Sequence, residues 1–230
     1  GDVFSADHIL TIFDHMKKLK LLDRCKAVLS GYIGSAEIGF AIKKMVAELK
    51  SNQDILYLCD PVMGDNKKCY VKQEVQSFFK DNLSADIITP NQYEAEILSG
   101  VTITDLKSLK QASKALFARG LKVVIITSVV FKDNSKKHYF YTSDGHSEYL
   151  MPVKQYKFST HVNGTGDLFS SVFLGGYLKN QDFKMALQVA NYYLDEVLLS
   201  TKKAKERELQ VLSNKYSSVD KSKLVSLISI

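Results

Sequence analysis

Short apolar segments alternate with longer segments of helical periodicity along this chain, and this alternation constrains the fold more than any other feature of the sequence. The segments that read as buried strands are residues 27–30, 55–59, 86–89 and 123–127. Between the first two, Ser35 is a candidate N-cap followed by apolar residues at helical spacing. Strands and helices in this order predict an α/β fold with a mostly parallel central sheet and helices on both faces.

A hairpin is predicted after these strands. Residues 138–142 and 147–152 have strand character and are joined through Asp144-Gly145, a pair typical of tight turns. We expect this late hairpin to add an antiparallel edge to the sheet. From Thr165 the rest of the chain reads as helix.

Composition supports an ordinary globular domain. The 230 residues are 45% apolar and 24% charged, which excludes disorder and coiled coil. No repeat, low-complexity tract or linker divides the chain, so we expect a single domain over residues 1–230.

Net charge, apolar run length and cysteine content indicate which partners and which cellular compartment to expect. The net charge of +6 permits an anionic ligand, but the basic residues are scattered, so we expect no nucleic-acid partner. No run approaches the roughly 20 apolar residues of a membrane span, so we expect no membrane partner. Cys25, Cys59 and Cys69 lack metal-ligand spacing and cannot all pair, which indicates a reducing compartment, the cytoplasm.

Residues that follow strands are the first candidates for a site, because ligands of such sheets bind beyond the carboxyl ends of the strands. Gly164, Thr165, Gly166 and Asp167 open an apolar helix. Glycines allow a sharp turn that exposes N–H groups at a helix N-terminus, where an anion is stabilised. Asp167 could accept a proton from an attacking hydroxyl. The alternative is a glycine-rich turn with an aspartate cap.

Carboxylates also follow the strand at residues 55–59. Asp60 and Asp65 lie on the next loop and could hold a hard cation through oxygen ligands, directly or through water. Tyr70 could stack on or hydrogen-bond a ring. The alternatives are an Asp-Pro turn with a solvated Asp65, and an ordinary half-buried tyrosine.

Polar side chains follow the remaining strands as well. Asn91 and Glu94 are three residues apart at a predicted helix start, so they can share one face. Glu94 could orient a metal-bound water and Asn91 could donate to a phosphate; equally, they could be an N-cap and its capping-box partner. Thr127 and Ser128 could contact a phosphate or merely end a strand.

These motifs are more specific as an ordered set than singly. The set comprises residues 30–35 (Ser-Gly-Tyr-Ile-Gly-Ser), 59–65 (Cys-Asp-Pro-Val-Met-Gly-Asp), 85–96, 124–128, 164–169 and 207–211. It resembles the ribokinase-like superfamily and, within it, the pyridoxal kinases, over almost the whole chain. The sequence contains neither a Walker-type phosphate loop nor a dinucleotide-binding G-x-G-x-x-G after a first strand.

The resemblance implies a phosphotransferase that moves the γ-phosphoryl group of ATP to the 5′-hydroxyl of pyridoxal, pyridoxine or pyridoxamine, in vitamin B6 salvage. Asp167 would be the catalytic base, and the amides of Gly164, Thr165 and Gly166 would stabilise charge on the phosphoryl oxygens. ATP with Mg²⁺ or another divalent cation, a monovalent cation such as K⁺, and a cytoplasmic homodimer are also implied.

The same resemblance implies roles for other residues. The metal-site residues would be Asp60, Asp65, Glu94 and, for the monovalent cation, Thr89. The nucleotide contacts would be Asn91, Glu94, Thr127, Ser128, Thr165 and the segment Gln155, Tyr156, Lys157 and Phe158. Tyr70 and Asp167 would contact the vitamin.

One feature departs from the family, which begins with a further strand and vitamin-binding residues before the equivalent of Gly1. We therefore expect this chain to be truncated at its N-terminus relative to the family. Two alternative functions stay open. One is hydroxymethylpyrimidine phosphate kinase, which shares Asp-Pro-Val-Met and Thr-Pro-Asn-x-x-Glu but usually carries Cys in place of Asp167. The other is a non-catalytic nucleotide-binding protein.

Overall fold

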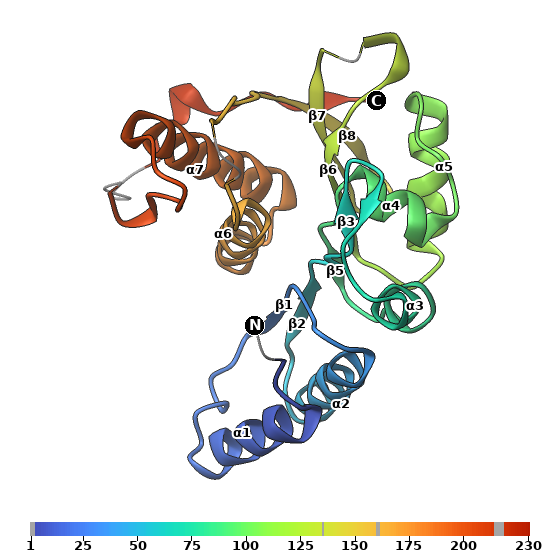
Figure 1. The fold of residues 1–230 in the computed structure, drawn as a ribbon, viewed down its shortest axis with the longest axis vertical. Helices are drawn as coiled ribbons and strands as arrows, with labels where there is room; N and C mark the ends of the chain where they lie inside the picture. The colour runs from blue at the N-terminus through green and yellow to red at the C-terminus, as the bar shows by residue number, and fades with distance from the viewer. Residues whose placement is uncertain (1–2, 135, 160–161, 214–218) are drawn as a thin grey trace.

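A seven-stranded sheet runs through the middle of the molecule in a computed structural model that describes residues 3–134, 136–159, 162–213 and 219–230 (Figure 1). From edge to edge the strands are β1 (Ala27–Ser30), β2 (Leu56–Cys59), β5 (Ile87–Ile88), β6 (Val123–Val129), β7 (His138–Ser143), β8 (Glu148–Val153) and β9 (Ile228–Ser229). The strands β1, β2, β5 and β6 are parallel, and β7, β8 and β9 are antiparallel to their neighbours. The predicted fold class is confirmed.

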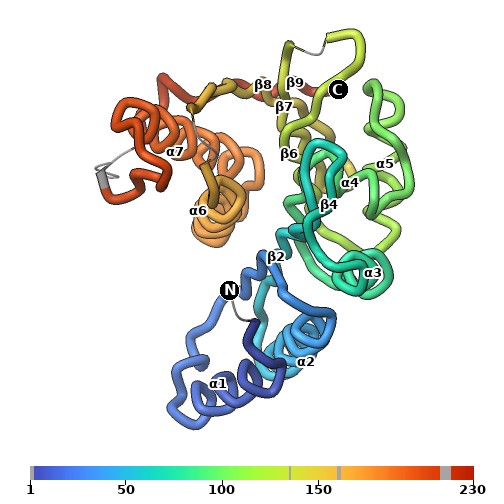
Figure 2. The backbone as a smooth tube through the Cα atoms, viewed as in Figure 1, coloured from blue at the N-terminus to red at the C-terminus, as the bar shows by residue number. Residues whose placement is uncertain are grey.

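Helices cover both faces of this sheet. They are α1 (Ala6–Lys18), α2 (Ala36–Asn52), α3 (Gln73–Asn82), α4 (Gln92–Ser99), α5 (Leu106–Phe117), α6 (Thr165–Asn180) and α7 (Phe183–Ala204). Figures 1 and 2 show α6 and α7 together on one side of the sheet and α3, α4 and α5 on the other, with α1 beside α2. None of the helices in the described ranges combines the length and apolar composition that a bilayer crossing requires.

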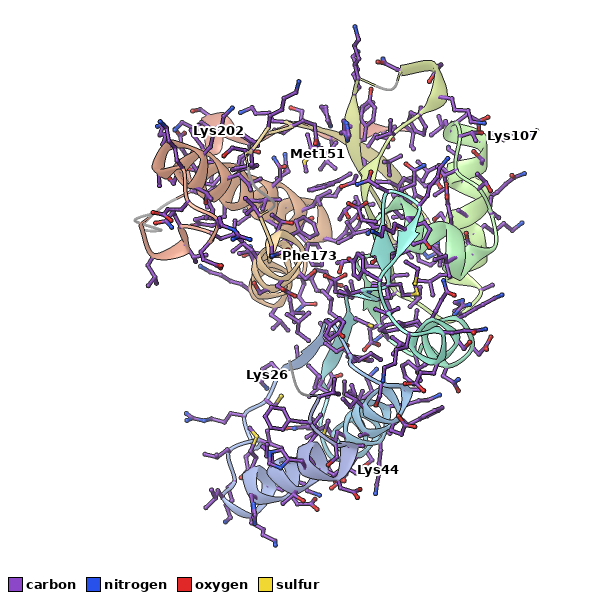
Figure 3. The ribbon with its side chains drawn as sticks, in the orientation of Figure 1. Lys26, Lys44, Lys107, Met151, Phe173 and Lys202 are labelled. Atoms are coloured by element: carbon purple, nitrogen blue, oxygen red, sulfur yellow. The ribbon has the colours of Figure 1, made fainter. Side chains whose placement is uncertain are left out.

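Residues of β6 alternate between the two layers. Val124 and Ile126 belong to an apolar cluster with residues of α2, α3, α4 and α5, whereas Ile125 belongs to a second cluster with residues of α6 and α7. Met151 and Phe173, labelled in Figure 3, are buried in this second cluster. The near-continuous apolar run of β6 therefore reflects burial on both faces, as is typical of a parallel strand.

Several elements differ from the sequence prediction. A small antiparallel hairpin, β3 (Gly64–Asp65) and β4 (Lys68–Cys69), forms where only a loop is predicted. β9 pairs with β8, so the predicted late hairpin lies one strand inside the edge. The helical prediction from Thr165 onward fails after Ala204, where α7 ends because Lys205 adopts a left-handed conformation with φ of 58°.

Asp86 lies at the amino end of β5, on the side of the sheet opposite the carboxyl ends of the parallel strands. Its side chain contacts three other segments of the chain. Its Oδ2 lies 2.6 Å from Lys50 Nζ and 2.8 Å from the Tyr57 N–H, and its Oδ1 lies 3.1 Å from Lys122 Nζ. Burial acts to raise the pKa of Asp86, but the hydrogen bonds from Lys50, Tyr57 and Lys122 together outweigh it and lower the pKa below its ordinary value.

Replacing Asp86 by asparagine is expected to lower the free energy of unfolding by about 2 kcal/mol at pH 7, because an amide cannot pair with both lysines. Because the pKa of Asp86 is lower in the folded than in the unfolded chain, the carboxylate stabilises the fold at pH values above the unfolded-state pKa of about 4. This stabilisation is lost as the pH falls through the folded-state pKa. The difference between the two chains should therefore shrink as the pH is lowered from 7 to about 3.

Urea unfolding at both pH values measures this difference, with exposed Asp54→Asn as the matched control. An equally large difference at both pH values would contradict the ion-pair interpretation of Asp86.

Candidate active site

A cavity of about 720 Å³ opens at the carboxyl ends of the parallel strands. Residues that follow β1, β2 and β5 line it, together with Thr127 and Ser128 near the end of β6 and the first turns of α6. The sequence-predicted residues in its wall are Asp60, Asp65, Tyr70, Thr89, Asn91, Glu94, Thr127, Ser128, Gly164, Thr165, Gly166 and Asp167. Segments distant in the sequence thus supply one site.

The glycine turn places an open helix end in this cavity. Gly164 precedes α6 in a left-handed conformation with φ of 83°, which glycine adopts without the steric cost of a side chain. Within the described part of the chain, no side chain caps this helix end. The N–H groups of the first turn and the positive end of the helix dipole are therefore available to an anion in the cavity.

Two carboxylates lie against glycines beside this helix end. A Cβ atom added at Gly31, just after β1, would lie 3.1 Å from Asp167 Oδ1. A Cβ atom added at Gly166 would lie 3.0 Å from Asp60 Oδ2. Both distances are shorter than comfortable carbon–oxygen contacts, so the absence of side chains at these positions lets the carboxylates sit close to the backbone.

Ionisation of the buried carboxylates of the cavity is unfavourable without a cation. Burial, together with the nearby charges of Glu94 and Asp167, raises the pKa of Asp60 to about 8. No lysine, arginine or histidine forms an ion pair with Asp60, Glu94 or Asp167 among residues 3–134, 136–159, 162–213 and 219–230. A cation in the cavity would relieve this repulsion and favour the ionised forms.

The donor set fits a magnesium ion that keeps water ligands. No three His, Cys, Asp or Glu side chains of the described residues converge as a closed metal site. Asp60 is buried, whereas Asp65 is exposed and accepts a hydrogen bond from the Asn66 N–H at 2.7 Å. Mg²⁺ is commonly held by one or two carboxylates, waters and substrate phosphates, so this arrangement of oxygens suits it.

Asn91 and Glu94 form a capping box at the start of α4 and also line the cavity. Asn91 Oδ1 accepts from the Glu94 N–H at 3.0 Å, and Glu94 Oε2 accepts from the Asn91 N–H at 2.8 Å. Glu94 Oε1 accepts from the Met63 N–H at 2.8 Å. Burial raises the pKa of Glu94 to about 7 although these N–H donors act to lower it. Asn91 and Glu94 therefore cap α4 and line the cavity at the same time.

Ser128 reaches the cavity through an irregularity in β6. The pairing of β6 with β7 shifts register between Ile126 and Val129, and Ser128 adopts a left-handed conformation with φ of 57°. Thr127 is held beside the start of α4 by its N–H, which donates to the Pro90 carbonyl at 2.8 Å. The bulge places both hydroxyl-bearing residues in the cavity wall.

The segment after β8 carries the remaining predicted nucleotide contacts. Gln155, Tyr156, Lys157 and Phe158 are not among the residues that line the cavity. The Tyr156 side chain hydrogen-bonds with Asp195 of α7, and Lys154 Nζ lies 3.5 Å from Asp195 Oδ2. These contacts hold the start of the segment against α7.

The polar cavity residues Tyr32, Asn163 and Ser170 were not predicted as site residues. Tyr32 follows β1 by two positions and is largely exposed, so the strand-end rule that finds Asp60 would also have found it. Ser170 is buried on α6, three residues after Asp167, and helical spacing alone would have placed the two on neighbouring positions of one face.

Comparison with known proteins identifies the class of protein, a ribokinase-like kinase. Residues 13–211 match the family model described as phosphomethylpyrimidine kinase. Pyridoxal kinase PdxY of Aliivibrio fischeri is 34% identical over 221 residues, which cover 93% of this chain and 76% of that protein. The Vibrio vulnificus PdxY protein is 35% identical over 228 residues, covering 97% of this chain and 78% of that protein. The chain belongs to this kinase family, in its pyridoxal kinase branch.

Solved structures agree with this assignment. Pyridoxal kinase from Leishmania donovani in complex with ADP and pyridoxamine has a TM-score of 0.87 and 26% identity, covering 100% of this chain and 83% of that one. Plasmodium falciparum PdxK with AMP-PNP and PL has a TM-score of 0.84 and 26% identity, covering 99% of this chain and 82% of that one. The resemblance stated from the sequence motifs is confirmed.

Glu94→Ala is expected to lower the free energy of unfolding by about 2–3 kcal/mol, because it leaves buried N–H groups of Met63 and Asn91 without an acceptor. Asp105→Ala removes an exposed capping box at α5 and should cost only about 1 kcal/mol. Urea unfolding of the two variants measures the difference. Equal losses would show that Glu94 acts as a simple cap.

Proposed function

We propose that this chain transfers the γ-phosphoryl group of ATP to the 5′-hydroxyl of pyridoxal, pyridoxine or pyridoxamine. The observation that carries the proposal is an open helix N-terminus beside Asp167 in the cavity of a chain that belongs to the pyridoxal kinase branch. The substrate oxygen forms a bond to the γ-phosphorus while the bond between that phosphorus and the bridging oxygen breaks, and ADP leaves.

Asp167 is the proposed catalytic base, which takes the proton of the attacking hydroxyl. Its carboxylate lies beside Gly31 and in the first turn of α6, so it shares the cavity with the N–H groups of Gly164, Thr165 and Gly166. Those N–H groups are the proposed donors to the phosphoryl oxygens on which charge develops. Positioning and charge stabilisation of this kind supply most of the acceleration in phosphoryl transfer.

Divalent and monovalent cations are part of the proposal. Asp60, Asp65 and Glu94 are the proposed residues for Mg²⁺, directly or through water, and Thr89 is the proposed residue for a monovalent cation such as K⁺. A divalent cation supplies neutralisation of charge on the transferred phosphate. The buried, unpaired carboxylates of Asp60 and Glu94 support this assignment.

The walls of the cavity suggest how the two substrates are held. Asn91, Thr127, Ser128 and Thr165 are the proposed nucleotide contacts, since they line the cavity. Tyr32 and Tyr70 are exposed aromatic side chains of the same cavity, and we assign them to the vitamin ring. Gln155, Tyr156, Lys157 and Phe158 stay proposed nucleotide contacts, from the resemblance to the family alone.

The organisation of the chain is also part of the proposal. One sheet joins both helical layers, which supports a single domain over residues 1–230. A cytoplasmic homodimer is proposed from the resemblance to the family. Exposed apolar side chains in and around α1, such as Phe4, Ile12 and Leu19, support an apolar contact surface.

Asp167→Asn is expected to reduce the rate of phosphorylation at least about a hundredfold while leaving ADP affinity within about twofold, because the amide cannot accept the hydroxyl proton. Phosphorylated product is measured with pyridoxal, pyridoxine and pyridoxamine, and with hydroxymethylpyrimidine phosphate because of the family model. Exposed Asp133→Asn is the matched control. Near-normal turnover by Asp167→Asn would refute the assigned base, and preference for the pyrimidine would favour the alternative kinase.

Asp60→Ala is expected to weaken ADP binding in Mg²⁺ about tenfold or more and to leave ADP binding in EDTA nearly unchanged, because the variant lacks a carboxylate for the cation. Isothermal titration of ADP under both conditions measures this. If the ratio of the two affinities stays as in the unsubstituted chain, Asp60 has no role toward the metal.

A further inference from the structure

Ser170 connects two cavity residues that follow different strands. It lies on α6, its side chain is 1% exposed, and it forms part of the cavity wall. Its Oγ is 2.8 Å from Thr89 Oγ1, just after β5, and 3.5 Å from Asp60 Oδ2, just after β2. One small hydroxyl on the helix that carries Asp167 thus contacts both of these residues.

The number of protons available fixes the direction of these hydrogen bonds. A serine or threonine hydroxyl has one proton to donate, and an ionised carboxylate only accepts. An ionised Asp60 can only accept, so in the long 3.5 Å contact with Asp60 the donor is Ser170. Its oxygen then accepts the proton that Thr89 donates, because two hydroxyls 2.8 Å apart share a single hydrogen bond.

This direction determines what Thr89 offers to the cavity. With its only proton directed to Ser170, the Thr89 oxygen retains lone pairs for a cation. Hard cations take oxygen lone pairs as ligands, and a hydroxyl proton directed at the cation would repel it. The Ser170 hydroxyl therefore affects the orientation of both the Asp60 carboxylate and the Thr89 hydroxyl.

We propose that Ser170 is a positioning residue, whose hydroxyl holds the Asp60 carboxylate and turns the Thr89 hydroxyl so that both present acceptor oxygens to the cations that bind with the nucleotide. The inference rests on the proposed function, because that function assigns the cation to this part of the cavity. Ser170 itself does not contact the reacting atoms.

Ser170→Ala tests this role, with Ser171→Ala as the matched control. Ser171 is the next residue of the same helix, is exposed, and donates to the Leu168 carbonyl at 2.9 Å. We expect Ser170→Ala to weaken ADP binding in Mg²⁺ about fivefold to tenfold and to leave ADP binding in EDTA unchanged. Ser171→Ala should change neither. Circular dichroism and thermal unfolding establish that both variants are folded.

A double-mutant cycle with Thr89→Val tests whether Ser170 acts through Thr89. If it does, Ser170→Ala should weaken Mg²⁺-dependent ADP binding less in the Thr89→Val chain than in the unsubstituted chain. Independent, multiplicative effects of the two substitutions would overturn the coupling between these hydroxyls.

The outcomes separate this inference from the proposed function. If the unsubstituted chain binds ADP equally in Mg²⁺ and EDTA, the proposed cation site is wrong and the role of Ser170 is overturned with it. If the unsubstituted chain shows the Mg²⁺ dependence and Ser170→Ala retains it in full, only the role of Ser170 is overturned. A loss of equal size in Mg²⁺ and EDTA would also overturn it, because a general packing defect has that effect.

Discussion

Repulsion between buried carboxylates is the constraint on which this site depends. Asp60 and Glu94 lie buried at the carboxyl ends of the parallel strands, where burial first and nearby negative charge second raise their pKa values. The backbone N–H groups of Met63, Asn91 and Gly64 offset part of the cost of ionisation for Glu94. The remaining cost is lowest when a cation occupies the cavity, so nucleotide and metal are expected to stabilise the folded chain together.

Buried aspartates at the two ends of the parallel strands have opposite environments. At the amino end of β5, Asp86 is satisfied by two lysines and a backbone N–H, and its pKa is lowered. Just after β2, the Asp60 carboxylate accepts one long hydrogen bond from a described residue, Ser170, and its pKa is raised. A satisfied carboxylate contributes stability, whereas an unsatisfied one keeps oxygen ligands available. Partners, rather than residue type or burial, distinguish the structural aspartate from the candidate functional one.

Most of the parallel sheet could be predicted from the sequence because its strands are apolar on both faces and are followed by polar residues. The same rule places Asp60, Asn91 and Asp167 at one edge. α3 was missed although Val75, Phe78 and Phe79 have helical spacing, because its N-cap position is a lysine without a side-chain capping bond. The contact of Ser170 with Thr89 joins residues 81 positions apart in the sequence, so only the tertiary structure reveals it.

The left-handed conformation of Ser128 has a consequence for how this chain can change. A residue with a Cβ atom costs roughly 1–2 kcal/mol in that conformation, whether or not the cavity is occupied, and glycine would avoid the cost. Glycine would also remove a hydroxyl from the cavity wall. Thermostability and ligand affinity therefore favour different amino acids at this position, so variants selected only for resistance to heat would tend to lose the serine.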